Sequence, residues 1–247
     1  MSKLFHILGE AIPEVWEKSI FELLEKGEWA LKAGATEKHR ILNCALIAEI
    51  RNPSAEPRLH PKLSKTMAEI YKREIIEGHE QHREGKCLTP FVYDYHERVF
   101  HYRPFLDQAI EVNQLELAVK RIQKEKFTNQ AVITTLIPHR DDKIVQEAWA
   151  KNQNPSIPCL SFLQFIATPD GRLDMFTVFR SHDAFRAAPY NWYGLSYLQE
   201  EVASRLGLSV GKYYSFSTSY HIYDSALKDV ERTIGKPKKT SFATLQP

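Results

Sequence analysis

A cysteine in the second half of the chain is followed by polar residues that could form a nucleophilic site. Cys159 comes directly after Pro158 and opens an apolar segment, so its sulfur could point into a cavity at the end of a strand. A thiolate is a strong nucleophile where nearby positive charge stabilises it, and Arg180 could approach Cys159 across a hairpin. The same pattern also fits a buried, inert thiol. Spacing alone leaves both interpretations open.

Polar residues further along the chain suit the recognition of a phosphorylated ring. Arg180 and Ser181 offer a guanidinium and a hydroxyl side by side, which could grip a phosphate or form a salt bridge at a strand end. Asn191 can present a donor and an acceptor to a pyrimidine edge, or it can cap a helix. His221 and Tyr223 lie two residues apart on a predicted strand and so face the same way. This pair could bind a sugar hydroxyl, or the histidine could pack in the core.

Two apolar segments joined by a turn would hold Cys159 and Arg180 together. Residues 160–167 and 172–180 have the composition of buried strands, and Thr168-Pro169-Asp170-Gly171 has the residues of a tight hairpin turn. Further strands are predicted over residues 41–50, 131–136 and 213–223. The spacing of apolar residues predicts helices over 12–27, 63–78, 107–123 and 194–206.

Two other segments carry a weaker pattern. Residues 91–102 are dense in aromatic residues and histidines, which favours a strand that packs in the core or lines a pocket for a planar ligand. Residues 138–158 are predicted to be a long polar connection with a short helix at 145–149. Strands and helices alternate without βαβ regularity, and there is no repeat or linker. This organisation predicts a single α+β domain over residues 1–247.

The composition is that of a soluble globular protein, with 43% hydrophobic and 26% charged residues. The 33 basic and 31 acidic residues are mixed along the chain, so there is no basic stripe and no nucleic-acid partner is expected. Cys44, Cys87 and Cys159 lack metal-ligand spacing, and His79 and His82 lack a third ligand, so no metal is expected. No segment approaches the roughly 18 apolar residues of a membrane helix. We expect a cytoplasmic protein without membrane contact.

The order of these motifs resembles the second half of thymidylate synthase. The similarity covers residues 155–224, and a fainter match extends upstream through Tyr95 and the predicted strand at Ala131. The N-terminal third is similar to the divergent, archaeal-type branch of this family of thymidylate synthases and pyrimidine hydroxymethylases. The motifs are P-C-L-S-F-L-Q-F (158–165), R-S-H-D-A-F (180–185), A-P-Y-N (188–191), the turn at 207–211 and H-I-Y (221–223).

The resemblance implies a mixed β-sheet flanked by helices that dimerises through the sheet. It also implies that Cys159 adds to C6 of a pyrimidine ring, so that C5 attacks a one-carbon unit from 5,10-methylenetetrahydrofolate or a related tetrahydropterin. Methylation of dUMP to dTMP is the expected reaction. The alternatives are a 5-hydroxymethylase acting on dUMP, UMP, dCMP or CMP, and a family member that binds nucleotide or RNA without turnover.

The resemblance further implies a role for each polar residue of the pattern. Arg180 and Ser181 would bind the 5′-phosphate, Asp183 the folate and ring pocket, Asn191 the O4/N3 edge of the base, and His221 and Tyr223 the 3′-hydroxyl, while Tyr95 would join the proton-transfer network. A glutamate that orders water near O4 is expected on the helix over 63–78. Glu69 is our choice there, with Glu74 as the alternative.

The sequence differs from the family at residues that bind the phosphate. The partner subunit's pair of arginines before the strand at Ala131 is replaced by Asn129 and Gln130. Charge-assisted hydrogen bonds are about twice as strong as neutral ones, so phosphate affinity is expected to weaken. Lys124, Lys126 or Arg40 could substitute, or the substrate could differ at its phosphate end.

Two further departures concern the exclusion of water. No tryptophan that would stack on the methylene intermediate is found in residues 78–87, and the closing C-terminal segment is not recognisable in 240–247. A wetter site favours capture by water and therefore the hydroxymethylase alternative. Asn191 favours uracil, because cytosine-specific relatives tend to carry aspartate there. An amide can flip, which leaves cytosine open.

Overall fold

The computed structural model describes residues 3–31, 40–78, 93–103, 110–153 and 156–235. Its strands are β1 (Leu4–Gly9), β2 (Glu28–Leu31), β3 (Arg40–Ile50), β4 (Val132–Thr134), β5 (Leu160–Ala167), β6 (Arg172–Phe179), β7 (His182–Asp183) and β8 (Ser209–Tyr223). They form one sheet in the order β1-β3-β8-β6-β5-β4, with β2 paired to β3 and β7 paired to β8. Parallel and antiparallel pairs both occur, so the sheet is mixed.

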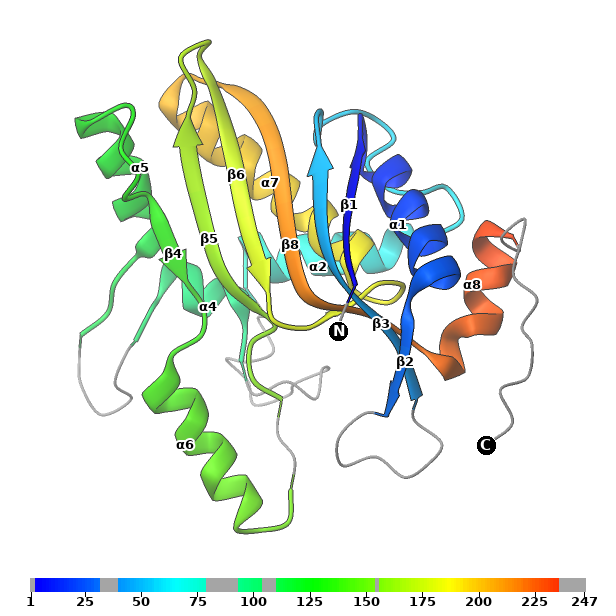
Figure 1. Cartoon of the computed structure of the whole chain (residues 1–247). Helices are drawn as coiled ribbons and strands as arrows, with labels where there is room; N and C mark the ends of the chain where they lie inside the picture. Colours follow the sequence, from blue (N-terminus) through cyan, green and yellow to red (C-terminus); the bar gives the residue numbers. More distant parts are fainter. Residues whose placement is uncertain (1–2, 32–39, 79–92, 104–109, 154–155, 236–247) are drawn as a thin grey trace.

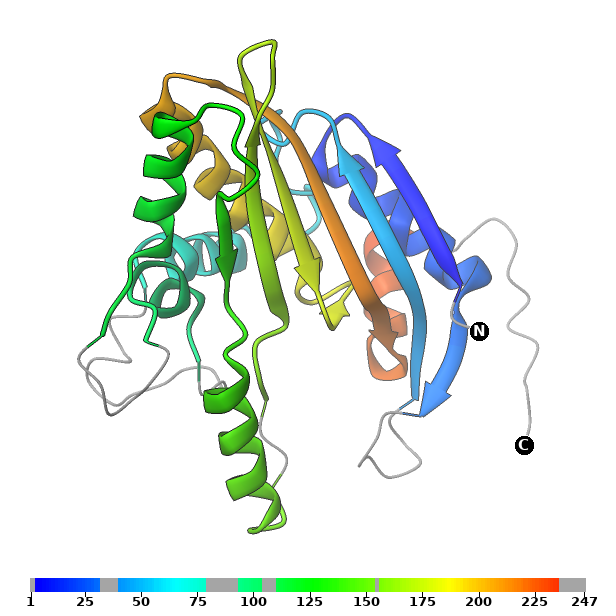
Figure 2. The same ribbon diagram turned by 60° about the vertical axis from the view of Figure 1, so that its left-hand side comes forward.

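Helices cover one face of this sheet. Figures 1 and 2 show α1, α2 and α7 packed behind the strands, with α6 extending away from the sheet below β4 and β5. The expected mixed sheet flanked by helices is therefore confirmed. The helices are α1 (Ile12–Lys26), α2 (Lys65–Ile76), α4 (Tyr95–Phe100), α5 (Gln114–Lys124), α6 (Pro138–Trp149), α7 (Ala188–Leu206) and α8 (Leu227–Ile234), with a 3₁₀ turn η1 (Asp224–Ala226).

The predicted hairpin is present and continues into a parallel crossover. β5 and β6 pair antiparallel around the turn at Gly171, whose φ of 80° suits glycine. β6 then pairs parallel with β8, and α7 connects them across the sheet. The sequence interpretation of an α+β order without βαβ units is thus incomplete, because β6, α7 and β8 form one such unit.

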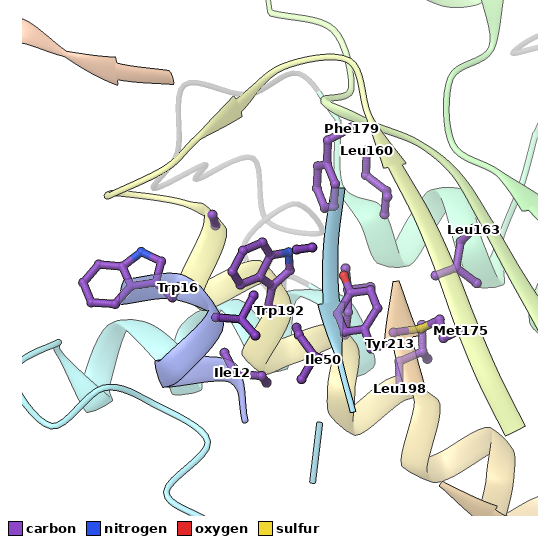
Figure 3. Packing of buried hydrophobic residues seen from close by; sticks show 14 of the residues in the cluster. Ile12, Trp16, Ile50, Leu160, Leu163, Met175, Phe179, Trp192, Leu198 and Tyr213 are labelled. Atoms are coloured by element: carbon purple, nitrogen blue, oxygen red, sulfur yellow. The ribbon is translucent and has the colours of Figure 1, made fainter. Parts of the chain in front are cut away.

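The core lies between the sheet and helices α1 and α7. Figure 3 shows Trp192 of α7 between Trp16 of α1 and the side chains of the strands, and both indoles are fully buried. α7 is buried on almost every side, because α2 packs on its outer surface. A Cβ at Gly194 would lie 2.8 Å from Cδ1 of Ile75, so this glycine allows α2 to approach α7 closely. The close approach fixes α2 beside the start of α7.

Three helices differ from the sequence prediction. α7 begins at Ala188, six residues before its predicted start. The other two begin at a side-chain cap. The aromatic-rich segment, predicted as a strand, contains α4, whose first turn is capped by Asp94 accepting from the Glu97 backbone N–H at 3.1 Å. The helix predicted over 107–123 begins at Gln114, where the Asn113 side chain accepts from the Glu116 N–H at 2.8 Å. Side-chain capping sets both starts, and apolar periodicity does not reveal it.

Residues 138–149 form a full helix where a polar connection with a short helix at 145–149 was predicted. α6 begins at Pro138, a residue suited to the first helical turn. Its buried Asp141 accepts from the Ile137 N–H and forms an ion pair with the fully buried Arg98 of α4 at 2.7 Å. This contact between residues 43 positions apart joins α6 to α4, and a local pattern cannot predict it.

The opposite face of the sheet is free of helices in the described part of the chain (Figures 1 and 2). Strand residues alternate between buried and half-buried, and half-buried apolar side chains line the uncovered face. Phe176 and Tyr214 stack on neighbouring strands with ring centroids 4.7 Å apart. We call this surface, which includes Ile47, Ile166, Phe176, Val178, Tyr214 and Phe216, the open sheet face.

Candidate active site

A cavity of about 960 Å³ opens where β5 begins and β6 and β8 end, with walls from α2, α4, α6 and the start of α7. This volume is large enough for a nucleotide together with a second ring system. The cavity brings together almost all of the residues singled out from the sequence: Tyr95, Cys159, Arg180, Ser181, Asp183, Asn191, His221 and Tyr223.

Cys159 lies at the cavity wall, half-buried, beside an irregularity in β5. The pairing of β5 with β6 shifts register between Leu160 and Phe162, and such bulges redirect neighbouring side chains. Nη2 of Arg180 lies 4.0 Å from the Cys159 sulfur. By contrast, Cys44 is fully buried in β3, and burial raises the pKa of its thiol to about 12. Cys159 is therefore the accessible thiol of this pair.

The Arg180 guanidinium is fixed by the chain that precedes Cys159. Its Nε donates to the Pro158 carbonyl at 2.8 Å, and Nη2 donates to the Ile157 carbonyl at 2.6 Å. The Arg180 backbone N–H donates to the Cys159 carbonyl at 2.9 Å. The acceptors of these bonds are backbone carbonyls and not carboxylates. The bonds therefore hold the positive charge of the guanidinium beside the thiol.

Two tyrosine hydroxyls lie next to the thiol. Tyr95 accepts from the Leu160 backbone N–H at 3.0 Å, and hydrogen bonds join the Tyr93 hydroxyl to Cys159 and Tyr95. Burial, followed by neighbouring charge, raises the pKa of both tyrosines, so both stay protonated. Sequence reasoning selected Tyr95 and missed Tyr93, although both belong to the same aromatic-rich segment.

The structure places Glu74, and not Glu69, in the cavity. Burial, with a smaller contribution from Asp94, raises the pKa of Glu74 to about 7. Glu69 instead accepts a hydrogen bond from the Tyr193 hydroxyl, which lowers the pKa of Glu69. Five helical positions rotate a side chain by about 140°, so the two glutamates of α2 point in different directions. Glu69, our choice from the sequence, therefore does not line the cavity, and the alternative Glu74 does.

The Asn191 side chain lines the cavity from the first turn of α7 and is 5% exposed. The helix N-cap is Ala187, so the capping interpretation of Asn191 is excluded. The Asn191 amide nitrogen lies 3.3 Å from Nε2 of His182, whose Nδ1 lies 3.0 Å from the Ser217 hydroxyl. Burial lowers the pKa of His182 to about 3, which keeps its ring neutral. Sequence reasoning did not assign a role to His182.

His221 and Tyr223 face the cavity together from the end of β8. Their rings meet edge to face at 5.1 Å, and Nδ1 of His221 lies 3.2 Å from the Ser219 carbonyl. Asp183 is held in place because its Oδ1 accepts the backbone N–H groups of Phe185 and Arg186.

Arg186 also lines the cavity and was missed from the sequence. Its guanidinium lies 5.9 Å from the centre of the Tyr223 ring. Asn129 and Gln130, the residues that replace the arginine pair, do not line this cavity. They precede β4, near the Gln164 side of β5, and both are exposed.

The mouth of the cavity is apolar. Met67 and Ile70 of α2 and Trp149 of α6 line the cavity, and these side chains are 40%, 38% and 63% exposed. Val145 lies on the same wall as Trp149. Exposed apolar side chains gathered at a cavity commonly mark a ligand surface. We call these four residues the apolar mouth.

No cluster of three or more potential metal ligands occurs among the described residues. In the same residues, no helix has the length and apolar character needed to cross a membrane. Cys87, His79, His82 and the segments 79–87 and 240–247 lie outside the described part of the chain.

Fold and site together define a mixed α/β protein with a thiol, a half-buried carboxyl and a buried amide in one cavity. A family model described as thymidylate synthase matches residues 63–246, and the chain belongs to the thymidylate synthase family. A relative from Methanothermobacter marburgensis is 31% identical over 93% of this chain and 98% of its own. One from Methanocaldococcus jannaschii is 29% identical over 86% and 88%. Both are named "Putative thymidylate synthase".

Proposed function

We propose that this protein transfers a one-carbon unit from 5,10-methylenetetrahydrofolate, or a related tetrahydropterin, to C5 of a pyrimidine nucleotide. Methylation of dUMP to dTMP is the proposed reaction. The observation that carries this proposal is the half-buried Cys159 thiol, 4.0 Å from Arg180, in a cavity that also holds Asn191. In this proposal, one cavity contains a nucleophile, a fixed cation and an amide that binds the base.

Cys159 is the nucleophile in this proposal. Its sulfur bonds to C6 of the ring, the C5–C6 double bond opens, and the electron pair is delocalised toward O4, which makes C5 nucleophilic. Glu74 keeps its proton up to about pH 7 and can donate toward O4, where negative charge develops. The C5 proton leaves after the new bond forms, and the Tyr93 and Tyr95 hydroxyls can relay it. The transferred carbon would separate from the pterin nitrogen as the C5 proton is lost. It would then gain a hydride or, from water, a hydroxide, while the S–C6 bond breaks, the C5–C6 double bond forms again and Cys159 leaves as the thiolate.

The other cavity residues position the nucleotide. Arg180 and Ser181 would bind its 5′-phosphate, and His221 with Tyr223 would bind the 3′-hydroxyl. Asn191 would bind the O4/N3 edge of the base, and Asp183 would support the ring and cosubstrate pocket. These assignments rest on the shared cavity and on the fixed orientation of the side chains.

The apolar mouth fits a planar bicyclic ring. Trp149 offers an exposed indole face, and Met67 and Ile70 offer further exposed apolar surface at the same cavity. When bound there, a methylene-bearing pterin supplies an electrophilic carbon and, for methylation, a hydride. The residues of this chain hold the ring and exclude water from one side of it.

We also propose that the protein is a single-domain, cytoplasmic homodimer that associates through the open sheet face. Half-buried apolar side chains such as Phe176 and Tyr214 support this assembly. Asn129 and Gln130 carry no charge, so across such a dimer they would contribute weaker, neutral hydrogen bonds to a phosphate.

Hydroxymethylation is the second candidate. Trp149 is 63% exposed, so the apolar mouth is open to water on the α6 side. Water that reaches the activated carbon would give a 5-hydroxymethyl product in place of a methyl group.

The test is to incubate the protein with dUMP, UMP, dCMP or CMP and methylenetetrahydrofolate, and then to weigh the products. A methyl mass gain on dUMP supports the proposal, and a hydroxymethyl gain selects the second candidate. Absence of any product, together with no tritium release from C5-labelled nucleotides, would instead indicate a member that binds nucleotide without turnover.

A further inference from the structure

In the proposed function, Asn191 binds the edge of the base, and its side-chain amide can take two orientations. With the oxygen toward the ligand it accepts a hydrogen bond, and with the nitrogen toward the ligand it donates one. Uracil carries a hydrogen on N3, whereas cytosine carries a lone pair there. The orientation of the Asn191 amide therefore decides which base the cavity accepts.

His182 lies behind this amide. Nε2 of His182 is 3.3 Å from the Asn191 amide nitrogen, and Nδ1 is 3.0 Å from the Ser217 hydroxyl. A neutral imidazole has one donor and one acceptor nitrogen. Because the amide nitrogen donates, Nε2 is the acceptor, and Nδ1–H donates to the Ser217 oxygen. This arrangement leaves Oδ1 of Asn191 for a ligand in the cavity.

The imidazole ring is held on several sides. It stacks on Phe179 with centroids 3.8 Å apart and planes 5° apart. Trp192 and Tyr220 meet it edge to face, each 5.9 Å away. His182 is 2% exposed, so water cannot replace either hydrogen bond. A half-turn of the ring would keep the stack on Phe179 but would break both hydrogen bonds.

We propose that His182 is a positioning residue that holds the Asn191 carboxamide with its oxygen toward the cavity and so makes the site specific for uracil over cytosine. This inference rests on the proposed function. A flipped amide would set Oδ1 against the lone pair on Nε2, and a buried polar group without a partner is costly. Cytosine N3 would meet a second acceptor, so the site would reject it.

The test measures binding of dUMP and dCMP by titration calorimetry, without cosubstrate, to the full-length protein. We expect wild type to bind dUMP about 100-fold more tightly than dCMP, because a site built around a hydrogen bond rejects an analogue that lacks it. His182→Phe keeps the stack on Phe179 but removes both ring nitrogens. Its preference should fall to about tenfold or less.

Two further variants separate orientation from stability. Ser217→Ala leaves the imidazole in place but removes the acceptor of Nδ1–H, so the preference should also fall. Tyr220→Phe removes a hydroxyl that bonds to Ser19 and leaves the His182 nitrogens untouched. This control should lose thermal stability and keep the wild-type preference for dUMP.

Nitrogen-15 NMR of the free protein determines the tautomer of His182 in the absence of any ligand. An unprotonated Nε2 supports the inference, and a protonated Nε2 overturns it. Equal binding of dUMP and dCMP by wild type, or an unchanged preference in folded His182→Phe, would overturn this inference and leave the proposed function standing. Failure of both nucleotides to bind would overturn the proposed function together with the inference.

Discussion

Arg180 reaches across the hairpin to within 4.0 Å of the Cys159 sulfur, and the carbonyls of Ile157 and Pro158 hold it there. The guanidinium thus supports the loop that carries the thiol and also supplies positive charge. A lysine could supply the charge, but it could not make the same forked set of hydrogen bonds. Loop support and charge can therefore be tested separately.

Arg180→Ala should slow alkylation of Cys159 by iodoacetamide about tenfold at constant pH and lower turnover of dUMP about 100-fold or more. Arg180→Lys should recover part of the alkylation rate but little of the turnover. Peptide mapping assigns the label, and buried Cys44 should stay unlabelled in the native protein. Equal alkylation rates in wild type and Arg180→Ala would refute a role for this charge.

Glu74 and Glu69 form a matched pair on α2. Glu74→Gln should lower kcat about 100-fold, because a half-buried acid in the cavity is lost, whereas Glu69→Gln should stay within about threefold of wild type. The pKa of Glu74 near 7 also predicts that kcat declines as the pH rises above about 7. That decline should vanish in the residual activity of Glu74→Gln. The reverse ranking of the two variants would return the role to Glu69.

His182 predicts a stability change in acid. Its pKa is about 3 in the folded protein and 6.5 as the ordinary value, so the unfolded chain binds the proton more tightly. The contribution of neutral His182 to the free energy of unfolding is therefore complete above pH 6.5, and it is lost as the pH falls toward 3. At pH 5 it has fallen by about 2 kcal/mol. Urea unfolding at pH 7.5 and 5 should show this loss in wild type and a smaller one in His182→Phe; equal losses would contradict it.

Trp149 is expected to act on the cosubstrate and not on folding. Trp149→Ala should raise the KM for methylenetetrahydrofolate about tenfold, since stacking on an indole face is lost, and should leave the Tm almost unchanged. Phe127→Ala is the control, because Phe127 is similarly exposed, at 60% against 63%, and does not line the cavity. A KM equal to that of the control would remove Trp149 from the site.

The hairpin that holds Cys159 and Arg180 could be predicted from the sequence, since its signals are local, whereas the helix that carries Asn191 was predicted only from residue 194 and begins at Ala188. A turn with proline and glycine joins two apolar strands, and a glycine ends α7 after a run of apolar residues. The side chains near the ends of these elements therefore meet in one cavity. The ordered motifs pointed to the same set of residues.

The remainder of the site depends on contacts that a local pattern does not contain. Glu74 and Glu69 both fit the helix, and only packing of α2 against α7 fixes which one enters the cavity. Trp149 reaches the mouth because α6 is anchored by the buried pair of Arg98 and Asp141. The position of such a helix cannot be inferred from its polar composition.

Tritium release from dUMP labelled at C5 tests the covalent role of Cys159 most directly. Loss of the C5 hydrogen requires attack of the thiol at C6, so wild type should release tritium in the presence of methylenetetrahydrofolate. Cys159→Ser should release it at least about 1000-fold more slowly while still binding dUMP. Release by Cys159→Ser at the wild-type rate would contradict the covalent mechanism.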